Sequence, residues 1–249
     1  MLRRFALALA LLPLIILPHP ALAGQVRVAV AANLLEPAQA IAAAFRAETG
    51  NTLELGVGST GQLYVQITHG APYDVFLSAD ATHPAMAEAA GLAVPGSRLT
   101  YGIGRLVLYS KIPGLVDDKG AVLTRGGFAK LAIADPETAP YGRAAVQTLK
   151  KLKAYDRIRS SLVQGASMTQ TFHFVETGAA DLGFVALSQV IKRPGGSRWL
   201  VPAADHTPLV QQAVLMKVGA GNPAAKAFLV YLKSRRARAI LADYGYQAP

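Results

Sequence analysis

The segment VRVAVAANLLEPAQAIAAAF, residues 26–45, decides the fold of this chain. Its first six residues (26–31) form a short apolar run rich in valine, which predicts a buried parallel strand rather than a helix. The alanine-rich amphipathic stretch that follows predicts a helix over residues 34–46. Asn33 stands between the two, and asparagine is among the residues that cap helix starts best. We therefore expect a strand, an Asn33 cap and a helix, in that order.

This order of elements predicts a place and a charge for a ligand. Open α/β sheets bind ligands beyond the carboxyl ends of their parallel strands, where the next helix begins. The first amide groups of a helix have no partner inside it, and the positive end of its dipole favours an anion. The opening segment therefore predicts an anion site close to Asn33.

Residues 1–23 have the pattern of a secretory signal peptide. Arg3 and Arg4 precede an apolar stretch, and Ala21-Leu22-Ala23 is typical of a cleavage site, so we expect cleavage after Ala23. A membrane anchor is the alternative, but a spanning helix needs about 20 apolar residues and prolines interrupt this stretch. We expect a periplasmic protein that is not inserted in the membrane after cleavage.

The composition of the mature chain favours a binding protein with two cores. Cleavage leaves 226 of the 249 residues, more than one hydrophobic core usually holds. The sequence contains no cysteine, so packing rather than disulfides must stabilise it and no thiol can carry a lipid. Without Arg3 and Arg4, 23 basic residues face 15 acidic ones, a net charge of +8. Because the basic residues are scattered and the chain is exported, we expect a small anion and no nucleic acid.

Strands and helices alternate along the mature chain, which predicts parallel βαβ units without an internal repeat. Strands are expected at 26–31, 53–57, 74–78, 105–109, 131–134, 183–186, 199–201 and 210–216, and helices at 34–46, 62–68, 83–90, 143–152, 169–176 and 224–244. Residues 101–104 and 202–208 are expected to cross between two lobes. We therefore predict lobe I from 24–102 plus 207–249, lobe II from 103–206, and a ligand cleft between them.

The enzyme motifs that we sought are missing from the mature sequence. It contains no HExxH, no nucleophile elbow around Ser59 and no phosphate-loop lysine motif. Asp74 and Asp80 lie at opposite ends of one predicted strand, about 20 Å apart, too far to act as an acid pair. We predict a protein that is not an enzyme and has no cofactor, with an exported enzyme as the alternative.

Small residues, hydroxyls or glycine stand at five predicted helix starts, at Asn33, 59–61, 78–80, 140–142 and 167–169. Capping alone would explain each of them. As a set they offer neutral donors such as Asn33, Thr60 and Tyr141, with no lysine or arginine clearly aimed inward. Such donors suit a fully deprotonated oxyanion, which has only acceptor oxygens. A protonated oxyanion would leave its own proton unpaired in a dry site, which costs about 1–3 kcal/mol.

With these residues the chain resembles the periplasmic molybdate-binding proteins of ABC transporters. The resemblance covers nearly all of the mature chain and is specific in the order and spacing of its motifs. They are VAVAANL (28–34), GSTGQLYVQI (58–67), GAPYDVFLSAD (70–80), ADPETAPYGRAAV (134–146), FVETGAADLGFVALSQV (174–190) and YLKSRRARAILADYGY (231–246).

The resemblance implies an α/β, two-lobed type II periplasmic binding protein fold. Each lobe would be a mostly parallel sheet flanked by helices, with two crossover strands joining the lobes. It also implies a monomer that captures molybdate, and tungstate, and delivers the ion to a membrane ABC permease. Molybdenum would be bound only as the oxyanion, without direct protein–metal ligands. Another oxyanion such as sulfate, or a small organic acid, remains the alternative ligand on the same fold.

The resemblance also implies which residues contact the anion. The donor after the first strand falls on Asn33, where many members have serine, and the hydroxyl at the second helix start on Thr60 beside Ser59. Backbone amides fall on Ala79 and Met168, and the position in the PYG turn falls on Tyr141. The chain departs from the family at Ala186, where some members use a tyrosine, and at Met168, where a smaller apolar residue is usual. Tyr141 would then supply the missing hydroxyl.

Overall fold

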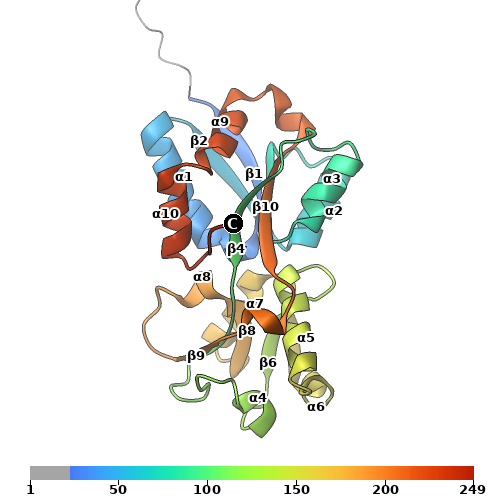
Figure 1. Ribbon diagram of the computed structural model, residues 1–249, viewed down its shortest axis with the longest axis vertical. Helices are drawn as coiled ribbons and strands as arrows, with labels where there is room; N and C mark the ends of the chain where they lie inside the picture. The colour runs from blue at the N-terminus through green and yellow to red at the C-terminus, as the bar shows by residue number, and fades with distance from the viewer. Residues whose placement is uncertain (1–22) are drawn as a thin grey trace, which may run out of the picture.

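The structure is a computed structural model that describes residues 23–249. Two lobes are stacked along the long axis of the molecule, and the chain runs between them twice (Figure 1). The predicted signal peptide falls almost entirely on residues 1–22, which lie outside the described residues.

Lobe I is built around a five-stranded sheet in the order β2-β1-β3-β10-β4. Strands β1, β2 and β3 are parallel, whereas β10 is antiparallel to both of its neighbours, so one strand runs against the other four. The strand bounds are Gln25–Ala31 for β1, Thr52–Gly58 for β2, Val75–Ser78 for β3, Leu99–Gly104 for β4 and Leu209–Leu215 for β10.

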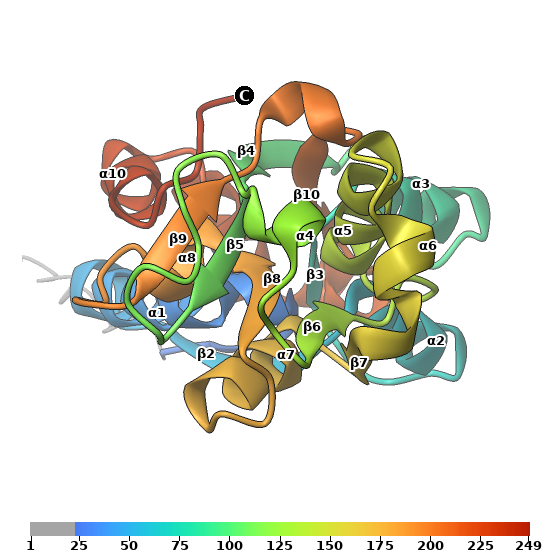
Figure 2. The same cartoon turned by 90° about the horizontal axis from the view of Figure 1, so that it is seen from below.

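Lobe II repeats this arrangement in the order β7-β6-β8-β5-β9, with β5 as the reversed strand. Figure 2, seen from the lobe II end, shows α5 and α7 on opposite sides of this sheet. Its strands are β5 (Leu106–Ser110), β6 (Leu131–Ala134), β7 (Leu162–Gly165), β8 (Leu182–Ala186) and β9 (Ser197–Leu200). The two lobes therefore share one topology although the sequence shows no repeat.

Alternating side chains of β1 explain why helices cover both faces of the lobe I sheet. Val28 and Val30 pack into a core with Phe45 and Phe228, beneath α1, α9 and α10. Ala29, between them, faces the opposite core, with Leu63 beneath α2 and α3. The helices of lobe I are α1 (Leu35–Thr49), α2 (Thr60–Thr68), α3 (Thr82–Ala89), α9 (Pro223–Tyr231) and α10 (Arg235–Asp243).

Lobe II has one large core on both faces of its sheet, with Leu108, Ile133 and Phe184 among its fully buried members. Its helices are α4 (Val122–Arg125), α5 (Pro140–Lys151), α6 (Tyr155–Ile158), α7 (Met168–Glu176) and α8 (Leu187–Val190). Short 3₁₀ turns complete the chain: η1 (Ala32–Leu34), η2 (Arg159–Ser161), η3 (Ala203–Asp205) and η4 (Lys217–Gly221).

The chain passes from sheet to sheet at Arg105, between β4 and β5, and returns between β9 and β10. The C-terminal helices α9 and α10 pack on lobe I, so that lobe is made of two separate parts of the sequence. The pairing of β4 with β10 continues to Gly104, while the domain limits given above stay a prediction.

The predicted fold class is confirmed, but some elements differ from the prediction. The single helix expected at 224–244 is wrong: the chain leaves helical structure after Tyr231 and starts again when the Ser234 hydroxyl caps α10 by accepting the Ala237 N–H at 3.1 Å. Strand β7 and helices α4, α6 and α8 were not predicted, and strand β4 was expected only as a crossing at 101–104. Within residues 23–249, no helix has the length and apolar character needed to span a membrane.

Candidate functional site

A small cavity lies between the lobes, beyond the carboxyl ends of β1 and β3 and at the starts of α5 and α7. Its volume is about 10 Å³, far below the roughly 300–1,000 Å³ of pockets for organic ligands. None of the lining side chains that the structure describes is charged. The lining residues are Ala31, Ala32, Asn33, Ser59, Thr60 and Ala79 from lobe I, and Ala139, Pro140, Tyr141 and Met168 from lobe II.

All six residues predicted to contact the anion line this cavity, and each is at most 3% exposed. They come from four helix starts, those of η1 with α1, α2, α5 and α7, and from the turn after β3. The converging helix starts bring free amide groups and partial positive charge to a site without a formal charge. This arrangement favours a small anion.

Thr60 is held so that its hydroxyl proton stays available. The Ala79 N–H donates to Thr60 Oγ1 at 3.1 Å, which occupies the acceptor side of the hydroxyl. In this structure the Ala79 N–H donates to Thr60 and not into the cavity, so the direct contact of the Ala79 amide with the anion stays a prediction. What Ala79 supplies instead is the orientation of a neighbouring donor.

Ser59 caps α2 in a capping box with Gln62. Its Oγ accepts the Gln62 N–H at 3.4 Å, and the Ser59 N–H donates to Gln62 Oε1 at 3.4 Å. The start of α2 is thereby fixed, and the Ser59 hydroxyl, like that of Thr60, accepts within the protein and keeps its proton.

Tyr141 provides the hydroxyl from lobe II. It is 1% exposed, and its oxygen accepts a hydrogen bond from Gln211 Nε2 at 3.1 Å. Burial raises the pKa of the Tyr141 phenol well above its ordinary value, and the nearby Tyr246 adds to this, so the proton is retained. A Cβ on Gly104 would lie 2.1 Å from this hydroxyl, so glycine is required there for Tyr141 and Gln211 to meet.

Asn33 lies in the site, but not in the way that its position predicts. It belongs to η1, and neither η1 nor α1 has a side-chain cap, so the predicted capping role is wrong. Its Nδ2 donates to Gln211 Oε1 and to Tyr246 Oη, each at 2.9 Å, which uses both amide protons inside the protein. The side-chain NH₂ therefore does not point at a ligand, and the donor that Asn33 offers is its backbone N–H at the start of η1.

Met168 is the first residue of α7, behind a Ser167 cap that accepts the Gln170 N–H at 3.3 Å. Its carbonyl accepts from Gln189 Nε2 at 3.0 Å, and Gln189 Oε1 accepts the Ala186 N–H at 3.0 Å. Ala186 itself is buried at the end of β8 and does not line the cavity. Gln189 thus ties the position of the missing family tyrosine to the start of α7.

The lobes are in direct contact on both sides of the cavity. The Gly61 N–H of lobe I donates to the Thr138 carbonyl of lobe II at 2.8 Å, next to Thr60. Arg193 Nη2 of lobe II lies 2.9 Å from Glu36 Oε1 of lobe I. Because both contacts cross the boundary, the structure is that of a closed form.

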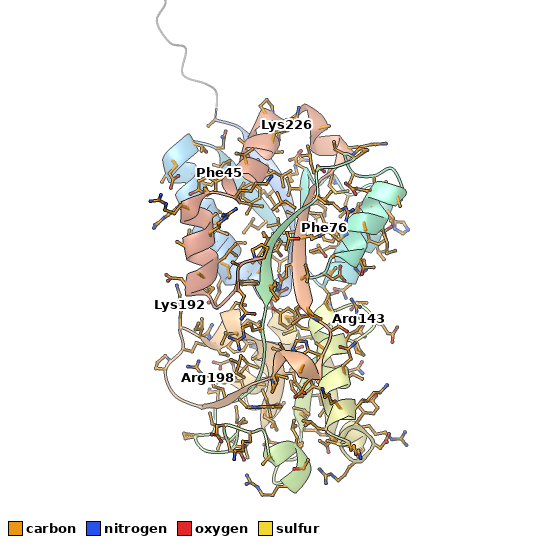
Figure 3. The ribbon with its side chains drawn as sticks, viewed as in Figure 1. Phe45, Phe76, Arg143, Lys192, Arg198 and Lys226 are labelled. Carbon is orange, nitrogen blue, oxygen red and sulfur yellow. The ribbon has the colours of Figure 1, made fainter. Side chains whose placement is uncertain are left out.

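A third contact across the boundary joins Asp80 to Arg143, which Figure 3 places where the two lobes meet. Arg143 Nη2 lies 3.0 Å from Asp80 Oδ2, and His83 Nδ1 lies 2.9 Å from the same oxygen. Burial alone would raise the pKa of the Asp80 carboxyl, but the hydrogen bond and charge of His83 outweigh it, so the pKa lies below its ordinary value. Asp80 is therefore an ionised anchor for Arg143.

The residues that the sequence did not suggest are those behind the cavity wall. Gln211, Tyr101, Tyr246 and Ser188 are all buried and hydrogen-bonded around Asn33 and Tyr141. A glutamine inside the apolar strand LVQQAVL was the available signal, because a buried polar side chain must find partners. Their partners lie up to 213 positions away, which a one-dimensional pattern does not reveal.

A larger groove, with a volume of about 720 Å³, runs beside α10. Arg235 and Arg238 line it, but none of the six predicted residues does. We expect the anion in the small cavity rather than in this groove, because neutral donors from both lobes line the small cavity.

Comparison with known proteins finds relatives over nearly all of the described chain. Residues 26–247 match the family model of bacterial extracellular solute-binding proteins. The molybdate-binding protein ModA of Rhodobacter capsulatus is 51% identical over 245 residues, covering 98% of this chain and 96% of its own. ModA of Azotobacter vinelandii is 50% identical over 227 residues, 90% of each chain. The solved periplasmic molybdate-binding protein of Azotobacter vinelandii superposes with a TM-score of 0.88 at 42% identity, covering 90% of this chain and 99% of that one.

Proposed function

Because the chain belongs to the molybdate-binding proteins within the bacterial extracellular solute-binding family, we propose that it captures molybdate in the periplasm and delivers it to an ABC permease. The cavity between the lobes is the proposed binding site, with tungstate as a second ligand of the same shape and charge. Molybdenum enters only as the oxyanion, so the protein needs no cofactor and performs no catalysis.

The observation that carries this proposal is the chemistry of the cavity wall. Hydroxyl protons of Thr60 and Tyr141 come from different lobes, and helix starts add backbone amides around an uncharged space. Such a wall satisfies an ion that has only acceptor oxygens. The charge of the ion is balanced by oriented donors and helix dipoles rather than by a lysine or arginine.

Closure explains how capture becomes delivery. Each lobe holds only part of the donor set, so the ligand has more contacts in the closed form and shifts the equilibrium towards it. A permease that recognises the relative position of the two lobes would then distinguish loaded from empty protein without touching the ion. The protein acts as a monomer in this scheme, because one chain supplies all the donors.

Titration calorimetry of the mature chain, residues 24–249, tests the proposal with molybdate, tungstate, sulfate and phosphate. We expect tight binding of molybdate and tungstate and much weaker binding of sulfate and phosphate. Tighter binding of sulfate would assign the protein to the alternative oxyanion class. Absence of heat with all four anions would contradict the proposal. Turnover of a small organic acid by the protein would favour an exported enzyme.

A further inference from the structure

Gln211 occupies the centre of the contacts between the lobes without lining the cavity. It is fully buried on β10, in the sheet of lobe I, yet it bonds to Tyr141 of lobe II. A bulge in the pairing of β4 with β10 explains its setting: Gln211 pairs with Gly102 and Gln212 with Thr100, which leaves Tyr101 as the extra residue.

The Gln211 side-chain amide makes three hydrogen bonds inside the protein. Its Oε1 accepts from Asn33 Nδ2 and from Tyr101 Oη, both at 2.9 Å. Its Nε2 donates to Tyr141 Oη at 3.1 Å. Tyr101 Oη has a second acceptor in the Ser78 carbonyl, also at 2.9 Å, so its single proton is shared between Gln211 Oε1 and that carbonyl.

The direction of these bonds follows from a backbone group that cannot turn over. The Asn33 carbonyl accepts the Tyr246 hydroxyl proton at 3.2 Å and the Ser188 hydroxyl proton at 2.7 Å. Tyr246 Oη, having donated, accepts from Asn33 Nδ2, which fixes the Asn33 amide. Asn33 then presents its second proton to Gln211 Oε1, which leaves Gln211 Nε2 facing Tyr141.

Tyr141 is the last member of this chain of hydrogen bonds. Its oxygen receives a proton from Gln211, so its own proton is left for the cavity. Gln211 Nε2 has no lone pair, so the Tyr141 O–H cannot turn towards Gln211 to donate its proton there.

From this arrangement we propose that Gln211 is a specificity-determining positioning residue, which holds the Tyr141 hydroxyl as a donor and so restricts the cavity to fully deprotonated oxyanions. The inference rests on the proposed function and names the residue that enforces its substrate class. An ion that carries its own proton, such as hydrogen phosphate, finds a donor where it needs an acceptor, and one hydrogen bond is replaced by a clash of two protons.

The test compares the Gln211→Glu variant with the unchanged protein. The introduced carboxyl group, when ionised, accepts the Tyr141 proton and turns the hydroxyl away from the cavity, whereas in its protonated form it can donate to Tyr141 as glutamine does. Burial raises the pKa of such a carboxyl, so both states are reached between about pH 5 and pH 9. We expect the molybdate Kd of the variant to fall at least roughly tenfold as the pH is lowered over this range.

The titratable groups around Gln211 do not change their protonation state over the pH range of this test. Burial raises the pKa values of Tyr101, Tyr141 and Tyr246, and Asp80, which lies near Tyr101, has a lowered pKa. Their protonation states therefore stay constant, and the molybdate Kd of the unchanged protein should vary by less than about twofold. Gln212→Glu is the matched control, because it adds the same charge one residue along β10, where the Gln212 side chain bonds outside the cavity, to Thr100.

Anion ratios separate the orientation of Tyr141 from simple repulsion by the new carboxylate. At about pH 8, repulsion weakens molybdate, sulfate and hydrogen phosphate alike, since all are dianions. The proposal predicts that affinity for hydrogen phosphate relative to molybdate rises at least roughly tenfold in Gln211→Glu, while the sulfate-to-molybdate ratio stays constant. An unchanged phosphate ratio would overturn it.

Gln211→Met keeps the side-chain length without adding charge. It provides a second test of the proposal if the Gln211→Glu variant does not fold. It frees Tyr141 to rotate, so the relative affinity for hydrogen phosphate should rise by roughly fivefold, with a folded far-ultraviolet spectrum. If the unchanged protein binds molybdate but both variants keep its anion ratios, this inference fails alone. If the unchanged protein does not bind molybdate, the proposed function fails.

Discussion

The two lobes present a hydroxyl to the same cavity, but they orient it by different means. In lobe I the Thr60 oxygen is held by the Ala79 N–H, a backbone group of the same lobe at 3.1 Å. In lobe II the Tyr141 oxygen is held by the Gln211 side chain, which belongs to a strand of the lobe I sheet. The two sheets share a topology, so this difference comes from the loops and side chains rather than from the fold.

The comparison indicates an order of events. Thr60 keeps its orientation when the lobes separate, because both partners move together. Tyr141 acquires its orientation only when lobe II closes on Gln211. Lobe I is therefore the preformed half of the site, where an arriving ion first binds, and the lobe II donor becomes directed as closure proceeds. The predictions below test this difference between the lobes.

Replacement of Tyr141 by phenylalanine should have the largest effect on binding. It removes a hydrogen bond to a charged ligand and leaves Gln211 Nε2 without its partner in the closed form. We expect molybdate binding to weaken by about 2–3 kcal/mol, roughly 30- to 150-fold in Kd, with little change in the stability of the ligand-free protein. Calorimetry and urea unfolding measure the two quantities, and an unchanged Kd would place the ion elsewhere.

Thr60→Val tests the preformed half and should differ in kind. It removes the second hydroxyl, which should weaken molybdate binding by about 1.5–2 kcal/mol. It also leaves the buried Ala79 N–H without a hydrogen-bond acceptor. We therefore expect the ligand-free protein to lose about 1–2 kcal/mol of unfolding free energy, unlike the Tyr141 variant. Equal effects of the two variants on ligand-free stability would break the proposed difference between the lobes.

Gly61→Ala should hinder closure while leaving both hydroxyls intact. A Cβ at Gly61 would meet the Thr138 Cα and carbonyl oxygen of lobe II at 3.1 Å, beside the hydrogen bond that joins the two backbones. We expect about 1 kcal/mol of weaker binding with unchanged preference among anions. Small-angle scattering with saturating molybdate should still show a compact form, and altered anion preference would contradict a role limited to closure.

Arg143→Ala should have the smallest effect, since its side chain is 40% exposed and the Asp80 contact lies at the rim. We expect molybdate binding to weaken by at most about 1 kcal/mol, and we expect this effect of the substitution to become smaller at high salt. The lowered pKa of Asp80 sets the pH dependence: its contribution is present above the ordinary carboxyl pKa and is lost as the pH falls through the lower pKa of the folded protein. A matched Asp80→Asn variant should remove this loss of stability at acid pH. If the variant still loses stability in the same pH range, another group is responsible for the loss.

Much of the fold could be predicted because its signals are local. The valine run of β1 and the alternation of short apolar strands with amphipathic helices depend on neighbours within one element. The break between α9 and α10 was missed because both helices are amphipathic and the Ser234 cap lies in a stretch without glycine or proline.

The site could be predicted as a set of positions but not as a set of bonds. The six residues were found at predicted helix starts, and in the structure they surround one cavity, five of them at helix starts and Ala79 in the turn after β3. Which of their protons point inward was decided by partners far away in sequence, such as Gln211 for Asn33, 178 positions on, and Ala79 for Thr60. Asn33 was expected to cap and to bind; its side chain does not cap, and its two amide protons go to Tyr246 and Gln211, while its contact with the anion stays a prediction.

The network around Asn33 also bears on how the protein folds. Its bonds join residues 70, 110, 178 and 213 positions apart, among the most distant contacts that the chain makes. Contacts of such separation form late, because long loops must close before they contribute. Lobe II is nearly continuous in sequence and can therefore build its core early, whereas the lobe I core, which joins Phe45 to Phe228, is completed only with the C-terminal helices. The anion site forms at the same late stage, so a chain that has not yet placed Tyr246 cannot retain its cargo.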